Sequence, residues 1–88
     1  MFKITRGSGF QMTFGNGWTV SVQWGACTYS SNYGQLIGTK CEKANSAEIA
    51  AWDAARNWYK FEDGDTVKGY CTTGDVAAFI TLISNMEP

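Results

Sequence analysis

The sequence predicts an α+β fold, in which an antiparallel sheet of about four strands in two hairpins carries one C-terminal helix on one face. Three observations lead to this prediction. Apolar and polar residues alternate over residues 10–14 and 18–24, the period-2 pattern of half-buried strands. A Gly-Asn-Gly break separates the two runs, as a hairpin turn requires. Near the C-terminus, apolar residues recur instead at helical spacing.

The composition indicates a single small domain over residues 1–88. Hydrophobic residues make up 44% of the chain and charged residues only 17%, which allows a packed core and argues against disorder. The net charge of −1 gives no strong signal for nucleic-acid binding. No segment resembles a signal peptide or a membrane span, so we expect a cytoplasmic protein without a membrane partner.

The first hairpin has one aromatic and β-branched face and one face of Thr, Ser and Gln. Residues 3–6 are expected to precede it as a short strand or an extended arm. An antiparallel sheet with one apolar face usually buries that face against another element of the protein. We therefore expect most of the apolar face to be core beneath the C-terminal helix, namely Phe10, Phe14, Trp18, Val20, Val22 and Trp24.

The second hairpin is predicted from strands over residues 46–52 and 57–61, joined by a turn over residues 53–56. A helix over residues 47–55 is the rival interpretation, since Ala, Glu and Ile suit helices. The strand is favoured because the aromatic run that follows is typical of strands. Residues 62–65 then form a turn, and residues 66–70 a short strand.

The C-terminal helix has the clearest signals in the chain. Thr73 is the expected N-cap, and Asp75 suits the positive end of the helix dipole in the first turn. Asn85 and Pro88 are expected to end the helix. The apolar stripe that must be buried consists of Val76, Phe79, Ile80 and Ile83.

Catalysis is not expected, because the chain contains no histidine and so lacks the commonest general base and neutral metal ligand. The acidic cluster at Asp63 and Asp65 suits turn formation. The three cysteines match no metal-binding spacing, and a bridge between Cys27 and Cys41 is left open. We expect no enzymatic activity, no metal and no cofactor.

The segment over residues 25–43 is the main candidate for binding, because it is long, rich in Gly, Ser and Tyr, and without periodicity. Tyrosine offers a large contact area, Asn and Ser adaptable hydrogen bonds, and lysine attraction for an anion. Either a protein or a small anionic nucleotide would suit this chemistry. The candidate residues are Tyr29, Asn32, Tyr33, Lys40 and Lys43, with Arg6 as a further cation.

Trp52 and Trp58 are the second candidate contact. If Ile49 and Ala51 face the helix, Trp52 lies on the other side of the sheet, where a large ring forms an adhesive patch. Self-association into a homodimer is its most economical use, because a two-fold contact needs only one patch. Core packing in a sheet of different register is the alternative.

The strings NGWTVSVQWG, AEIAAWDAARNWYKF and DTVKGY resemble those of small proteins encoded in tailed-phage genomes. The resemblance implies a non-catalytic protein that binds a host component in the bacterial cytoplasm. Inhibitors of bacterial defence systems are of this kind, including anti-CRISPR blockers of a host protein and sponges for a signalling nucleotide. The alternative is a small virion or assembly protein that self-associates through exposed aromatic residues.

Overall fold

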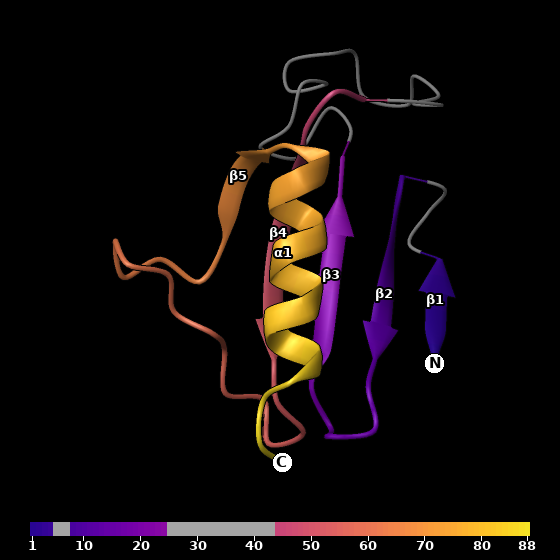
Figure 1. Cartoon of the computed structure of the whole chain (residues 1–88), viewed down its shortest axis with the longest axis vertical. Helices are drawn as coiled ribbons and strands as arrows, with labels where there is room; N and C mark the ends of the chain where they lie inside the picture. Colours follow the sequence, from indigo (N-terminus) through magenta and orange to yellow (C-terminus); the bar gives the residue numbers. More distant parts are fainter. Residues whose placement is uncertain (5–7, 25–43) are drawn as a thin grey trace.

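The computed structural model describes residues 1–4, 8–24 and 44–88, which form a sheet covered on one face by a helix (Figure 1). Neighbouring strands are antiparallel, and their order in the sheet follows the chain. The predicted α+β fold is confirmed, with five strands where about four were expected. The elements are β1 (Phe2–Ile4), β2 (Gly9–Thr13), β3 (Thr19–Gln23), β4 (Ala47–Trp52), β5 (Lys68–Cys71) and α1 (Thr73–Ser84).

The predicted first hairpin is β2–β3. The amide of Phe14 donates to the oxygen of Trp18 at 2.9 Å, and the amide of Gly17 donates to the oxygen of Phe14 at 3.0 Å. These bonds close a loop over residues 15–17 in which Gly17 has a φ of +88°. Glycine adopts this left-handed backbone without a steric penalty, which explains the Gly-Asn-Gly break.

Two later loops repeat this hydrogen-bond pattern, one between Asp53 and Asn57 and one between Phe61 and Asp65. Gly64 takes the left-handed position of the last loop, with a φ of +86°. In the middle loop the same position holds Arg56, with a φ of +68°. A residue with a Cβ atom is strained in this region, so Arg56 costs conformational energy that Gly17 and Gly64 do not.

Strand β4 confirms the strand interpretation over the rival helix, but the predicted second hairpin is wrong in its returning strand. Residues 57–61 form only an isolated bridge between Trp52 and Trp58, and β5 is the strand that pairs with β4. The cause is aromatic packing: the rings of Tyr59 and Phe61 lie 5.5 and 5.2 Å from that of Phe79 in α1. The Tyr59 amide still donates to the Ala51 oxygen of β4 at 2.9 Å, and the segment forms no regular strand beyond this contact.

Helix α1 is capped by Thr72 and not, as predicted, by Thr73. The amide of Asp75 donates to the Thr72 hydroxyl at 3.1 Å, and the amide of Thr72 donates to the Asp75 carboxylate at 3.0 Å. This reciprocal pair satisfies two amides that a helix start leaves without a partner. The helix ends at Asn85, as predicted, and this residue is its C-cap.

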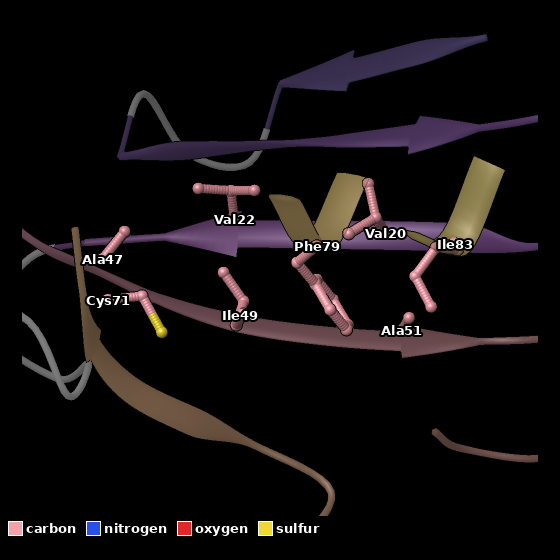
Figure 2. Close-up of a cluster of buried hydrophobic side chains, with 8 residues drawn as sticks. All are labelled: Val20, Val22, Ala47, Ile49, Ala51, Cys71, Phe79 and Ile83. Atoms are coloured by element: carbon pink, nitrogen blue, oxygen red, sulfur yellow. The ribbon is translucent and has the colours of Figure 1, made fainter. Parts of the chain in front are cut away.

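The core lies between α1 and the central strands, where Phe79 and Ile83 point into the sheet (Figure 2). Val20 and Val22 are buried there, as predicted. Phe10, Phe14, Trp18 and Trp24 are only half-buried at the margin of the core, which corrects the expectation for the aromatic face. The reason is the position of α1, which approaches β3, β4 and β5 but neither β1 nor β2.

Candidate binding surface

Most of the residues predicted to bind a partner lie outside the described residues. This applies to Arg6, Tyr29, Asn32, Tyr33, Lys40 and Lys43, and also to the pair Cys27 and Cys41. Of the predicted binding residues, the structure places Trp52 and Trp58.

Trp52 and Trp58 come together on the sheet face opposite α1, the side predicted for Trp52. Their ring centroids are 4.9 Å apart at an interplanar angle of 46°. Trp58 remains 46% exposed. The rings cover one another, so the pair is a packed contact at one corner of the sheet with the outer face of Trp58 available.

The turn beside this pair is held by the carboxylate of Asp53. Its Oδ1 atom accepts hydrogen bonds from the amides of Ala55 and Asn57, each at 2.9 Å, and its Oδ2 atom accepts one from the Asn57 side chain at 3.1 Å. The bonds from the Asn57 amide and side chain, more than that from Ala55, lower the pKa of Asp53 below 3.8. Asp53 therefore stabilises the turn, and both of its carboxylate oxygens already accept hydrogen bonds.

The rest of this sheet face is polar and closely filled. Thr13 and Thr19 share a hydroxyl hydrogen bond of 2.9 Å, and Gln23 donates to the Ser21 hydroxyl at 3.1 Å. The Gln23 side chain also occupies the space that a Cβ atom on Gly9 would need. Among residues 1–4, 8–24 and 44–88, the tryptophan pair is thus bordered by polar side chains on this face.

The larger apolar surface lies on the α1 side of the sheet, over β1 and β2. Phe2 is 76% exposed and Ile4 is 78% exposed. The β1–β2 register places Phe2 beside Met12 and Ile4 beside Phe10. All four lie on the α1 side of the sheet, but α1 runs over β3 and β4 and does not extend over β1 and β2 (Figure 1). We call Phe2, Ile4, Phe10 and Met12 the β1–β2 surface.

An apolar groove continues this surface toward the helix. Phe10 belongs to both, and the groove has a volume of about 450 Å³. Its walls include Val22 and Trp24 from the sheet and Val76 and Ile80 from α1. Cys71 lies at its base, and burial raises the pKa of the Cys71 thiol. A protonated, buried thiol is a packing group and a poor nucleophile.

The free edge of β1 has a defined set of outward main-chain groups. Met1 and Thr13 exchange two hydrogen bonds, of 2.8 and 2.9 Å. Hydrogen-bonded and non-bonded pairs alternate along an antiparallel ladder, so Lys3 faces β2, whereas the amides and carbonyls of Phe2 and Ile4 point outward. No described residue pairs with this edge, which lies at the margin of the sheet (Figure 1).

The sequence contained a signal for this surface, because Phe2, Lys3 and Ile4 alternate as a strand does. Sequence reasoning placed the strand over residues 3–6 and so missed the exposed pair. It also assumed that the helix would cover the first hairpin. An exposed face on β1 and β2 follows only when the lateral position of α1 is known.

The acidic residues of the described ranges are scattered or occupied in turns. Within residues 1–4, 8–24 and 44–88, no three His, Cys, Asp or Glu side chains group closely enough to hold a metal ion. Asp63 accepts a hydrogen bond of 2.9 Å from the amide of Asp65, in line with a turn role. The same ranges contain no helix with the length and apolar character needed to cross a membrane.

No protein-family model, curated protein or solved structure matches the chain. The candidate surface is therefore inferred from the structure of this chain alone.

Proposed function

We propose that this protein acts by binding another protein, without catalysis, and that the partner adds an extended strand to β1 while covering the β1–β2 surface. One observation carries the proposal: exposed Phe2 and Ile4 side chains sit beside an edge whose main-chain groups also point outward. Strand addition uses both kinds of group, because the main chain supplies hydrogen bonds and the side chains fill pockets or cover apolar surface.

The energetic scale supports this use of the surface. Complete burial of one large apolar side chain contributes roughly 1.5–3 kcal/mol. Phe2 and Ile4 are 76% and 78% exposed in the free protein, so about three quarters of that contribution is available to a partner. Phe10 and Met12 are half-buried and extend the contact toward the groove. Large apolar groups gathered in one place mark interaction sites more often than single exposed residues do.

The alternative to a binding role is that β1 is an ordinary edge strand without a partner. Short length and a lysine are devices that protect sheet edges from pairing, and β1 has both. Protection of this kind does not require two large exposed apolar side chains on the other face, which is why we favour a binding role.

The test compares the double variant Phe2→Ser/Ile4→Ser with Leu82→Ser. Leu82 is 46% exposed on α1 and contributes to neither the β1–β2 surface nor the groove, so its replacement is a control for the loss of an exposed apolar side chain elsewhere. Each protein is immobilised, and the bacterial proteins it retains are quantified by mass spectrometry. We expect the double variant to lose a partner that wild type and Leu82→Ser retain, at similar melting temperatures. Retention of the same partner by all three proteins contradicts the proposal.

A narrower proposal is that the partner belongs to a bacterial defence system and is inhibited inside the host cytoplasm. Its support is the resemblance to tailed-phage proteins. Expression in strains that carry defined defence systems should raise the plating efficiency of a restricted phage, and the double variant should lose this effect. Sequestration of a signalling nucleotide would instead restore plating equally with both proteins.

A virion or assembly role is the remaining alternative, favoured by the exposure of Trp58. Light scattering of the purified protein separates the two roles. A large assembly that forms without any partner, and that Trp58→Ser dissolves, would support the assembly role and not the binding role.

A further inference from the structure

We infer that the strand which adds to β1 carries an acidic residue flanked by two apolar residues, and that it runs antiparallel to β1. This inference rests on the proposed function and specifies the chemistry of its partner.

The register follows from the outward main-chain groups of β1. Every described strand pair of this sheet is antiparallel, and antiparallel pairing is slightly the more stable per residue, so we take the added strand to be antiparallel. Such a strand must form its hydrogen-bonded pairs with Phe2 and Ile4, since these residues direct their amides and carbonyls away from β2. The partner residue between those pairs then lies opposite Lys3 in a non-hydrogen-bonded pair. Side chains of such a pair approach most closely, with Cα atoms about 4.5 Å apart.

Lys3 determines the charge of the opposing residue. It is exposed, and its side chain lies on the face opposite α1, where its cross-strand neighbour is the neutral Gln11. No described carboxylate forms an ion pair with it. Opposite charges directly across an antiparallel pair are stabilising, and like charges are destabilising. An aspartate or glutamate is therefore the favoured partner of Lys3.

The same lysine disfavours a second copy of this chain as the added strand. The two-fold register that uses both Phe2 and Ile4 pairs them with each other across the interface. It thereby places Lys3 opposite the identical lysine of the second copy at the close pair. Lysine on an edge strand is a known device against such self-pairing.

Phe2 and Ile4 determine the character of the flanking residues. Directly opposed residues project to the same face, so the partner residues across from Phe2 and Ile4 lie on the α1 side. They would cover side chains that are 76% and 78% exposed. Ile4 itself lies beside Phe10, where the groove begins. We therefore expect the partner residues opposite Phe2 and Ile4 to be apolar.

The experiment uses blocked peptides of about eight residues, the length of an ordinary strand. They differ only at the centre, which reads Val-Glu-Val, Val-Gln-Val or Val-Lys-Val. Each is titrated by NMR against wild type, Lys3→Glu and Phe2→Ser/Ile4→Ser. We expect wild type to bind the Glu peptide about fivefold more tightly than the Lys peptide, the scale of one cross-strand charge pair. Lys3→Glu should reverse that order, and the double variant should bind none of the peptides.

The outcomes separate this inference from the proposed function. Equal affinity for the three peptides, still lost in the double variant, overturns the charge preference and leaves strand addition standing. The charge preference is likewise overturned if Lys3→Glu keeps the wild-type order. If no peptide binds and the double variant keeps its protein partner, both proposals fail. A wild-type dimer that the double variant abolishes also overturns the inference, because the occupant is then a second copy.

Discussion

The side-chain amide of Asn16 donates a hydrogen bond of 2.9 Å to the main-chain oxygen of Ile83, at the end of α1. It donates a second of 2.9 Å to the oxygen of Met86, while its own oxygen accepts from the amide of Trp18 at 3.0 Å. The last carbonyls of a helix lack partners within the helix. The β2–β3 loop thus caps α1 from 67 residues away and holds it over the central strands. That position leaves β1 and β2 uncovered.

Replacing Asn16 should lower stability substantially. Asn16→Ala removes the side-chain donor from the oxygens of Ile83 and Met86, and Ile83 keeps only main-chain donors such as the Met86 amide. We expect the free energy of unfolding to fall by about 1–3 kcal/mol in urea titrations. Gly15→Ala in the same loop is the control, because its new methyl group meets nothing within 4 Å. Equal stability of the two variants would show that the loop does not anchor the helix.

The repeated loop geometry predicts opposite effects at equivalent positions. Arg56→Gly should raise the free energy of unfolding by about 1 kcal/mol, because it removes a Cβ atom from a left-handed residue. Gly17→Ala should lower it by a similar amount, since it introduces the same strain at a φ of +88°. Thermal unfolding of both variants beside wild type provides the measurement. Destabilisation by Arg56→Gly would show that the arginine side chain makes a compensating contact.

The capping box predicts how the stability of α1 depends on pH. Hydrogen bonds from the Thr72 amide and side chain lower the pKa of Asp75 below 3.8. The carboxylate therefore stabilises the fold fully above that value, and the contribution is lost as pH falls through the lower folded-state pKa. The urea concentration at the unfolding midpoint should therefore decrease when the pH is lowered below about 4. In the Asp75→Asn variant this decrease should be smaller. The same decrease in the variant and in wild type would contradict the capping role.

Thr72 supplies the other half of the capping box. Thr72→Ala should lower the free energy of unfolding by about 1 kcal/mol at neutral pH. The neighbouring Thr73, the N-cap expected from sequence, is the control: Thr73→Ala should have little effect. A larger loss from Thr73→Ala would place the cap one residue later.

The local elements could be predicted because their signals are local. Alternation identified β2 and β3, and helical spacing identified Phe79 and Ile83 as the buried side of α1. The failures concern long-range choices. Tyr59 and Phe61 flank the polar Lys60, a pattern typical of a strand. The ring of Tyr59 nevertheless packs on Phe79, and β5 is the strand that pairs with β4. No local pattern encodes that competition.

The β1–β2 surface was not predicted from the sequence for a similar reason. Sequence reasoning pointed to an exposed ring at Trp52 or Trp58 but expected most of the aromatic face of the first hairpin, including Phe10, to be core. Whether Phe10 is covered depends on where α1 rests across a sheet of five strands. The hydrogen bond from Asn16 to Ile83 fixes that position, and it joins residues 67 apart in the chain.

The tryptophan pair should behave as a structural contact. Trp58→Ala removes a ring that packs 4.9 Å from Trp52, and such pairs contribute about 0.5–1.5 kcal/mol beyond area burial. We expect reduced stability, unchanged mass by light scattering and unchanged partner capture. Loss of a wild-type dimer in this variant would instead assign self-association to the pair.

Hydrogen exchange at β1 tests the central claim most directly, because the amides of Phe2 and Ile4 point away from the sheet in the free protein. These two amides should exchange rapidly alone and become protected when the partner is bound, while the amide of Lys3, which faces β2, should change little. Protection of the amides near Trp58, with Phe2 and Ile4 still exchanging rapidly, would contradict strand addition at β1.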